Sequence, residues 1–243
     1  MTTSPLGPGP LVYAHRGDRT RAPDNTLEAY RLAVEAGADG IELDVRRTRD
    51  GVLIVHHDDS DPTIGVFSSL DFRVLRAMAP HVPTLREATE SIPRHVFVNV
   101  EVKNDSNDAG FDADRSIVDE TLDALRAHDD AHRILLSSFD PLSMRRAGEV
   151  GPEFLLGQLL ASPVPLDIGV SLALDSGMDS IHPQLDHLRT DVAGLISGLR
   201  SDGLAVVVWD VNTPEEVSEV SAAGADVIIT DDPAMARSVI DQP

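Results

Sequence analysis

Apolar and polar residues follow a repeated order along the chain, in which a short apolar run precedes a longer segment with helical spacing. Val, Ile and Leu dominate the short runs, and Gly, Pro, Asp or Asn stands at their ends, as is typical of strands that alternate with helices. The short runs predict eight strands, centred on Val12, Ile41, Val98, Leu135, Leu155, Ile181, Val207 and Ile228. The longer segments predict helices at residues 27–35, 71–77, 84–91, 113–127, 142–149, 191–201, 214–223 and 233–240, with only a short helix expected within 163–176.

Eight alternations of strand and helix in 243 residues predict a single-domain TIM-type (β/α)8 barrel with right-handed crossovers. A doubly wound open sheet is the alternative. Residues 1–10 are predicted to be a flexible lead, and residues 11–243 the barrel domain. The lead has neither the basic start nor the apolar stretch of a secretory signal, and no apolar run approaches the ~18 residues of a membrane span.

Two carboxylates interrupt the second predicted strand. Glu42 and Asp44 are two residues apart, so they point to one face while their apolar neighbours point to the other. Two uncompensated acids on a buried face would repel each other and lose hydration, so a cation or a shared proton is expected between them. A hard, oxygen-seeking metal ion fits best. The alternative for these acids is a pair of ordinary salt bridges to Arg46 and Arg47.

Other polar side chains stand at the predicted carboxyl ends of strands, where barrel enzymes carry their active sites. His15 follows the first strand, Glu101 and Lys103 end the third, and Trp209 ends the seventh. A further apolar run at 52–55 delivers His57 to the same neighbourhood. The pattern therefore predicts a metal site beside a titratable imidazole. His56 is expected to point away from His57 and to be structural if the strand persists.

The composition of the chain limits which kinds of molecule it is expected to bind. A net charge of −21 argues against a nucleic acid or an anionic membrane as the main partner, because long-range repulsion slows encounter. An anionic small molecule would need a local positive focus, and Lys103 is the chain's single lysine. With no cysteine, a disulfide or a thiolate metal site is excluded, and we expect a cytoplasmic protein. The remaining acids, such as Asp105, Asp108, Asp112 and Asp114, are expected on the solvated surface.

The motifs, in their order, resemble the glycerophosphodiester phosphodiesterase family over nearly the whole chain. Any single motif is weak evidence, but the ordered set is specific. The matching segments are AHRG at 14–17, PDNT at 23–26, GADGIELDV at 37–45, TRDGVLIVHHD at 48–58, PTLREA at 83–88, VEVK at 100–103, SSFD at 137–140, VVWDVN at 207–212 and DVIITDDP at 226–233.

The resemblance implies a TIM barrel that hydrolyses glycerophosphodiesters to glycerol 3-phosphate and an alcohol. It implies one divalent cation, Ca²⁺ or Mg²⁺, held by Glu42, Asp44 and Glu101. It further implies that His15 and His57 are the acid and the base, and that Arg16 and Lys103 bind the phosphate, while Trp209 is either core or a wall of the substrate pocket.

Three departures from the family pattern stand out. Residues 61–64 read Asp-Pro-Thr-Ile where the family carries an arginine, so the arginine contact to the leaving group is missing there. The connection at 60–83 is brief, which predicts a reduced subdomain there. Asp210 stands where Thr is common.

Attack on a phosphodiester requires a positive charge that offsets the negative charge of the phosphate, and it requires two proton transfers. A metal ion can supply the positive charge, and two histidines can carry out the proton transfers. We expect the glycerol 2-hydroxyl to attack phosphorus, with His15 as base and His57 as acid, giving a cyclic phosphate that water then opens. Two other functions stay open at this point. One is a lysophospholipase D or another phosphodiester hydrolase on the same barrel, and the other is a non-catalytic binding protein.

Overall fold

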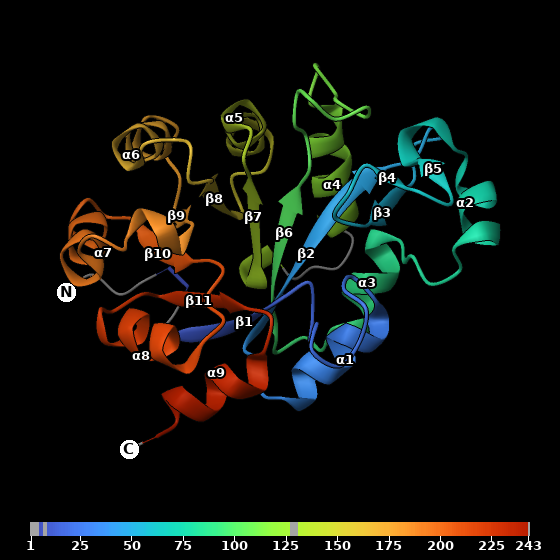
Figure 1. The fold of residues 1–243 in the computed structure, drawn as a ribbon. Helices are drawn as coiled ribbons and strands as arrows, with labels where there is room; N and C mark the ends of the chain where they lie inside the picture. Colours follow the sequence, from blue (N-terminus) through green and yellow to red (C-terminus); the bar gives the residue numbers. More distant parts are fainter. Residues whose placement is uncertain (1–4, 7–8, 127–130, 243) are drawn as a thin grey trace.

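Parallel strands form a closed barrel in the computed structural model, which describes residues 5–6, 9–126 and 131–242 (Figure 1). Adjacent strands run in the order β1-β11-β10-β9-β8-β7-β6-β2, and β2 pairs with β1 to close the eight-stranded barrel. A short strand, β3, pairs antiparallel with the end of β2. The strands span Leu11–His15 (β1), Gly40–Arg47 (β2), Leu53–Val55 (β3), Phe97–Val102 (β6), Ile134–Ser138 (β7), Leu155–Leu160 (β8), Ser180–Pro183 (β9), Ala205–Val208 (β10) and Val227–Thr230 (β11).

Helices lie on the outside of the strands and alternate with them along the chain (Figure 1). They span Leu27–Glu35 (α1), Phe72–Met78 (α2), Leu85–Ser91 (α3), Ser116–Arg126 (α4), Pro141–Val150 (α5), Leu166–Asp175 (α6), Val192–Ser201 (α7), Pro214–Ala222 (α8) and Pro233–Ile240 (α9). Within the described part of the chain, short 3-10 helices lie at Phe67–Ser69 (η1), Ala131–Arg133 (η2) and Leu185–His187 (η3). Among the described residues, no helix has both the length and the apolar character that a membrane crossing requires.

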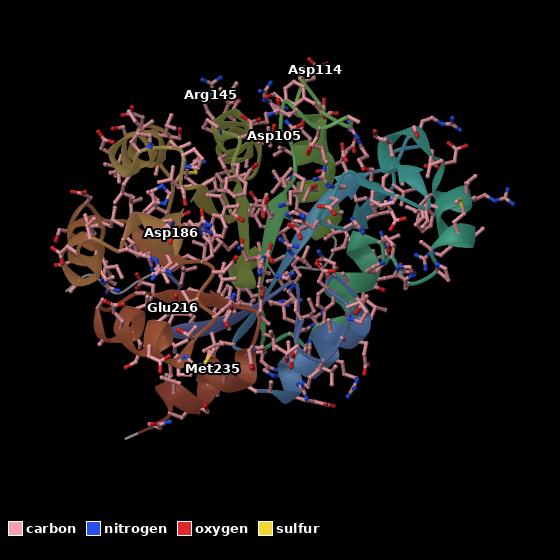
Figure 2. All side chains as sticks on the ribbon, in the orientation of Figure 1. Asp105, Asp114, Arg145, Asp186, Glu216 and Met235 are labelled. Atoms are coloured by element: carbon pink, nitrogen blue, oxygen red, sulfur yellow. The ribbon has the colours of Figure 1, made fainter. Side chains whose placement is uncertain are left out.

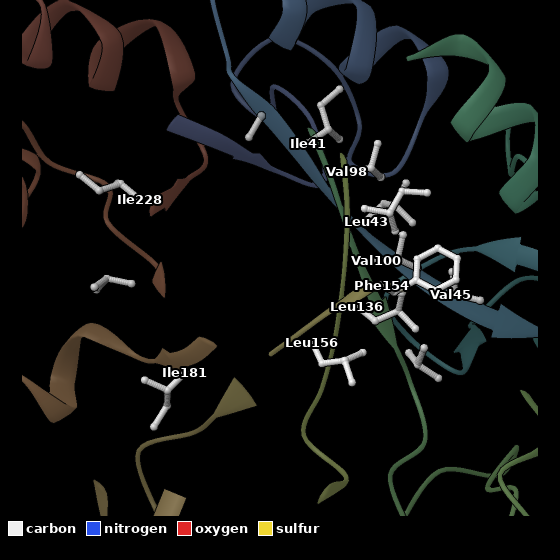
Figure 3. Packing of buried hydrophobic residues seen from close by; sticks show 14 of the residues in the cluster. Ile41, Leu43, Val45, Val98, Val100, Leu136, Phe154, Leu156, Ile181 and Ile228 are labelled. Atoms are coloured by element: carbon white, nitrogen blue, oxygen red, sulfur yellow. The ribbon is translucent and has the colours of Figure 1, made fainter. Parts of the chain in front are cut away.

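The main core lies between the outer faces of the strands and the helices. Outward-pointing residues of β2 and β6, such as Ile41, Leu43 and Val100, are fully buried there (Figure 3). A second cluster fills the barrel interior below the mouth and includes Tyr13, Leu135 and Val207. Because apolar residues use the outer face of each strand, the inner face near the carboxyl end is left for polar side chains.

The predicted barrel is confirmed, and the open-sheet alternative is wrong because β1 pairs with both β11 and β2. The strands lie where the pattern predicts them, but β10 ends at Val208, before Trp209. The helix α6 has ten residues and is longer than predicted. Of the predicted flexible lead, residues 1–4 and 7–8 lie outside the described residues, while Leu6 is buried in the interior cluster.

The segment between β3 and α3 forms a small addition at the barrel's edge. It contains a two-residue hairpin, β4 (Ser60–Asp61) and β5 (Gly65–Val66), then η1 and α2. Phe67, Leu75 and Val82 pack with Ile54 in a separate apolar cluster. Its small size agrees with the brief connection expected from the sequence.

The acids expected on the surface divide into two groups. Asp105 and Asp114 are exposed, and Figure 2 shows Asp114 at the upper edge of the molecule. The expectation is wrong for Asp108 and Asp112, which are only partly exposed and lie 2.8 Å from Arg46 and 3.1 Å from Arg47. Ion pairing to arginines that leave β2 draws these two acids inward.

Candidate active site

Three carboxylates meet on the inner wall of the barrel. Glu42 and Asp44 project from β2, and Glu101 lies directly beside Asp44 in the β2–β6 register. All three side chains are buried, and one oxygen from each lies within 4.8 Å of the others. This is the same-face arrangement that the period of two predicts.

Two cations contact these acids. The Nζ atom of Lys103 lies 2.9 Å from Oδ1 of Asp44 and 2.5 Å from Oε1 of Glu101. The Nε atom of Arg16 lies 3.2 Å from Oδ2 of Asp44. Three carboxylates thus face two cations, so one negative charge is left over when all are ionised.

The protonation of the acids reflects this balance. Burial raises the pKa of Glu42, and the charges of Asp44 and Glu101 raise it further. Burial also raises the pKa of Glu101, against the opposing charge of Lys103. Burial of Asp44 acts in the same direction, but Lys103 and Arg16 outweigh it and hold the pKa of Asp44 below its usual range. Without an added cation, Glu42 is therefore the acid that most favours its protonated form, and that proton removes the excess negative charge.

The turn after β1 positions Arg16 and the loop that follows. Arg16 has φ +58°, and its backbone N–H lies 3.0 Å from both the carbonyl oxygen and Oε2 of Glu42. Gly17 has φ +88°, and a Cβ there would lie 2.6 Å from the Cβ of Ala29 in α1. A glycine is needed for this close approach.

Asn25 holds Asp44 from the side away from Lys103. Its Nδ2 donates to Oδ2 of Asp44 at 2.8 Å, and its Oδ1 accepts from the Tyr30 hydroxyl at 3.1 Å. Thr26, rather than Asn25, caps α1 by accepting from the backbone of Ala29 at 3.2 Å. Asn25 is therefore free to orient a carboxylate.

His57 lies just beyond β3, which ends at Val55. Its Nδ1 is 2.8 Å from Oδ1 of Asp58, and its carbonyl oxygen accepts from Nε of Arg46 at 2.7 Å. Partial burial and the charge of Lys103 lower the pKa of His57, against the opposing charge of Asp44. His56 contacts the Phe67 ring edge-on at 4.7 Å between centroids, which fits the structural role expected for it.

His15 is surrounded at Nδ1 by groups from distant parts of the chain. Oδ1 of Asp231 is 2.7 Å away, Oδ1 of Asp210 is 3.4 Å away, and Nη1 of Arg19 is 3.2 Å away. Asp231 is itself held, since its backbone N–H donates to Oδ1 of Asn212 at 2.8 Å. Burial raises the pKa of Asp231, but the contacts with His15 and Arg19 together outweigh this, and the pKa lies below its usual range.

A pocket of about 150 Å³ joins these groups. Its lining combines titratable side chains, such as His15 and His57, with apolar ones, such as Phe139 and Trp209. The Phe139 and Trp209 rings meet edge-on, and Nε1 of Trp209 donates to the carbonyl oxygen of His182 at 2.8 Å. The lining of this pocket is His15, Arg16, Glu42, His57, Asn99, Glu101, Lys103, Phe139, Leu159, Trp209, Asp210 and Ile229. A second cavity of about 200 Å³ adjoins it at His57, Glu101, Lys103 and Phe139.

The structure brings together the eight residues singled out from the sequence: His15, Arg16, Glu42, Asp44, His57, Glu101, Lys103 and Trp209. The alternative in which Glu42 and Asp44 pair with Arg46 and Arg47 is wrong, because those arginines bind Asp108, Asp112 and Glu120. Sequence reasoning missed the contacts of Asn25, Asp210 and Asp231. Asn25 and Asp231 lie within matched motifs, but only the fold reveals what they touch.

Comparisons with known proteins show which family the chain matches. Residues 15–235 match the Glycerophosphoryl diester phosphodiesterase family model. A relative from Caldanaerobacter subterraneus subsp. tengcongensis, named glycerophosphodiester phosphodiesterase, is 31% identical over 239 residues, which cover 92% of this chain and 94% of the relative.

Solved structures share the fold. A glycerophosphodiester phosphodiesterase from Thermotoga maritima aligns with a TM-score of 0.78 at 24% identity, over 95% of this chain and 98% of its own. A phosphodiesterase from Oleispira antarctica, solved in complex with the product sn-glycerol-3-phosphate, aligns with a TM-score of 0.79 at 24% identity, over 96% of this chain and 97% of its own. The chain belongs to the glycerophosphoryl diester phosphodiesterase family, whose members are phosphoric diester hydrolases that act on glycerophosphodiesters.

Proposed function

We propose that this protein is a metal-dependent phosphodiesterase that hydrolyses a glycerophosphodiester to sn-glycerol 3-phosphate and an alcohol. The observation that carries the proposal is the buried cluster of Glu42, Asp44 and Glu101 on the wall of a pocket that also holds His15 and His57. The Oleispira antarctica neighbour with bound sn-glycerol-3-phosphate supports the choice of product.

The acids fit a divalent ion, Ca²⁺ or Mg²⁺. They supply only carboxylate oxygens, which hard cations prefer, and Lys103 and Arg16 leave one negative charge uncompensated. A bound ion would supply a positive charge that stabilises the extra negative charge of the phosphoryl oxygens in the transition state.

Two histidines supply the proton transfers. In the first step, Nε2 of His15 takes the proton of the glycerol 2-hydroxyl as its oxygen bonds to phosphorus. The bond from phosphorus to the departing alcohol breaks, and His57 gives its proton to that oxygen. The lowered pKa of His57 makes its protonated form a stronger proton donor.

The second step returns both histidines to their starting states. His57 takes a proton from water as the water oxygen bonds to the phosphorus of the cyclic phosphate. The bond to the glycerol 2-oxygen breaks, and His15 returns its proton there. Lys103 and Arg16 would hold the phosphate, and Trp209 would form a wall of the pocket.

The test is glycerol 3-phosphate release from a panel of glycerophosphodiesters, with EDTA and after adding back Ca²⁺ or Mg²⁺. We expect chelation to abolish release and one of the two ions to restore it. Full activity in EDTA would overturn the metal-dependent scheme.

Variants separate the histidines from the metal. His15→Ala and His57→Ala should each lower kcat by about 10²- to 10⁴-fold, while the ion still raises the unfolding temperature. Glu42→Gln should weaken that thermal shift. His81→Ala removes an exposed histidine outside the pocket and serves as the matched control. Substantial activity in either site-histidine variant would contradict the two-histidine scheme.

One observation favours a second substrate class. Phe139, Leu159, Trp209 and Ile229 give the pocket an apolar side, which could contact a lysophospholipid. The panel therefore includes a lysophospholipid, which is followed by release of its head-group alcohol because the phosphate stays on the acylated glycerol. Faster hydrolysis of this lysophospholipid than of every glycerophosphodiester would favour the lysophospholipase D activity.

A further inference from the structure

The surroundings of His15 indicate how this imidazole is oriented. Its Nδ1 faces the carboxylates of Asp231 and Asp210 at 2.7 and 3.4 Å. The described residues make no hydrogen bond to its Nε2, and the ring lines the pocket. The ring is therefore held at one nitrogen and leaves the other available to a substrate.

Either of two proton arrangements could satisfy these contacts. A proton on Nδ1 would be donated to Asp231, and the guanidinium of Arg19 would then donate to Oδ1 of Asp231, which lies 2.8 Å from its Nη1. A proton on Nε2 would instead leave Nδ1 to accept from Arg19 at 3.2 Å. Carboxylates only accept and a guanidinium only donates, so the two arrangements exclude each other.

The carboxylates favour the first arrangement. Oδ1 of Asp210 is buried and has no hydrogen-bond partner among the described residues, so a proton on Nδ1 also offsets its charge. With the proton on Nε2, the lone pair of Nδ1 would face two carboxylates, which is repulsive. The attraction of two carboxylates for a proton on Nδ1 thus outweighs the hydrogen bond that Arg19 would donate to an unprotonated Nδ1. The side chain of Arg19 is about a third exposed, so solvent weakens that hydrogen bond.

We propose that Asp231 is the positioning residue of His15, and that with Asp210 it keeps the proton on Nδ1 and the lone pair of Nε2 directed to the pocket. This rests on the proposed function, in which Nε2 of His15 takes the glycerol hydroxyl proton. Asn212 and Arg19 hold Asp231 in turn. Asp210, the departure from the family's common Thr, adds a second negative charge 3.4 Å from Nδ1.

A carboxylate lies beside each of the two pocket histidines, but the two carboxylates differ in their exposure to solvent. Asp58 contacts His57 from the next position in the chain, and its side chain is 69% exposed. Asp231 reaches His15 across 216 positions of sequence, and its side chain is 32% exposed. The less exposed contact is the one we expect to fix the imidazole's tautomer, because solvent competes less with it.

Asp231→Asn is the central test, because an amide can donate to Nδ1 and so invert the preferred tautomer. We expect kcat to fall by about 10²- to 10⁴-fold with KM nearly unchanged, and Asp231→Glu to recover part of the loss. Asp186→Asn is the matched control, since Asp186 is an exposed acid that also pairs with an arginine, Arg189.

A spectroscopic readout makes the test independent of turnover. In protein carrying ¹⁵N-labelled histidine, at alkaline pH and without metal, the ring ¹⁵N shifts report which nitrogen carries the proton. The His15 signals are assigned by their loss in His15→Gln. We expect an Nδ1–H tautomer in the wild type and a shift toward Nε2–H in Asp231→Asn.

Each result decides the proposal. An Nε2–H tautomer in the wild type, or an unchanged tautomer in Asp231→Asn, overturns it even if kcat falls. A changed tautomer with unchanged kcat overturns it as well. Absence of any phosphodiesterase activity in the wild type would instead refute the proposed function, while the ¹⁵N shifts would still report on the orientation of His15.

Discussion

Gly157 and His182 show how a single missing side chain shapes the barrel beneath the pocket. They lie on neighbouring strands, β8 and β9, and both face the barrel interior. A Cβ at position 157 would lie 2.2 Å from Nε2 of His182 and 2.7 Å from Oγ of Ser180. The imidazole of His182 therefore occupies space that only glycine leaves open.

Gly157→Ala should lower the free energy of unfolding by about 1–3 kcal/mol, because the added methyl group forces His182 or the strand to move. Gly198→Ala is the matched control. It lies in α7 with no atom within 4 Å of the new Cβ, so it should stabilise the helix by about 1 kcal/mol. Urea unfolding of the two variants checks this, and equal effects would contradict the packing argument.

At the scale of elements, α3 shows how a short helix is fixed to the barrel. Thr84 caps it by accepting from the backbone of Glu87 at 3.1 Å, and Glu87 Oε2 accepts from the backbone of Thr84 at 2.7 Å. Nη2 of Arg76, in α2, lies 2.5 Å from the same carboxylate oxygen. One acid thus joins the start of α3 to α2.

Glu87→Gln should lower the free energy of unfolding by about 0.5–1 kcal/mol at neutral pH, a value reduced for the partial exposure of both partners. The hydrogen bond from Arg76 is the main cause that lowers the pKa of Glu87 to about 2. Because the folded-state pKa lies below the unfolded value, this stability is present above the unfolded pKa and is lost as pH falls toward 2.

Unfolding of wild type and Glu87→Gln across this acid range checks the prediction. The two stabilities should converge at the acid end. Glu90→Gln, on the same helix, is the control, and we expect a change within about 0.5 kcal/mol. A Glu87→Gln effect that persists at the lowest pH would show that the charge is not responsible.

Strands were predictable because each is a β-branched or apolar run bounded by turn residues, and because tertiary packing agrees with that local pattern. The helix α6 was underestimated for a physical reason. Pro165 is its N-cap rather than a break, and Gly169 lies so close to Leu160 that a Cβ would be 2.7 Å from that side chain. A glycine that weakens the helical pattern is needed here for packing against β8.

At the scale of the whole molecule, barrel closure determines which site contacts a sequence can reveal. Glu42 and Asp44 were predictable because they lie on one strand with a period of two. The pairing of His15 with Asp231 was not, because it depends on β1 meeting β11 across the closure of the sheet. Local patterns predict which residues reach the mouth, and closure determines which of them touch.

The closed barrel also isolates His182 from water, and this should govern stability in acid. The side chain is fully buried, its Nε2 contacts Oγ of Ser180 at 2.9 Å, and its Nδ1 has no hydrogen-bond partner among the described residues. Burial lowers the pKa of His182 to about 3. The folded protein therefore keeps this imidazole neutral under conditions in which the unfolded chain protonates it.

Between pH ~6.5, where a histidine in the unfolded chain titrates, and pH about 3, the unfolded state binds one more proton at His182 than the folded state. The free energy of unfolding should therefore fall with decreasing pH, with a contribution from His182 of up to about 1.4 kcal/mol per pH unit. His182→Asn and His182→Gln should both be less stable near neutrality, since each disturbs packing, but both should lose stability less steeply in acid. Urea unfolding in EDTA at several pH values checks this, because the slopes of the three proteins can be compared whatever their absolute stabilities. Parallel slopes would mean that the acid lability of the barrel arises from other groups.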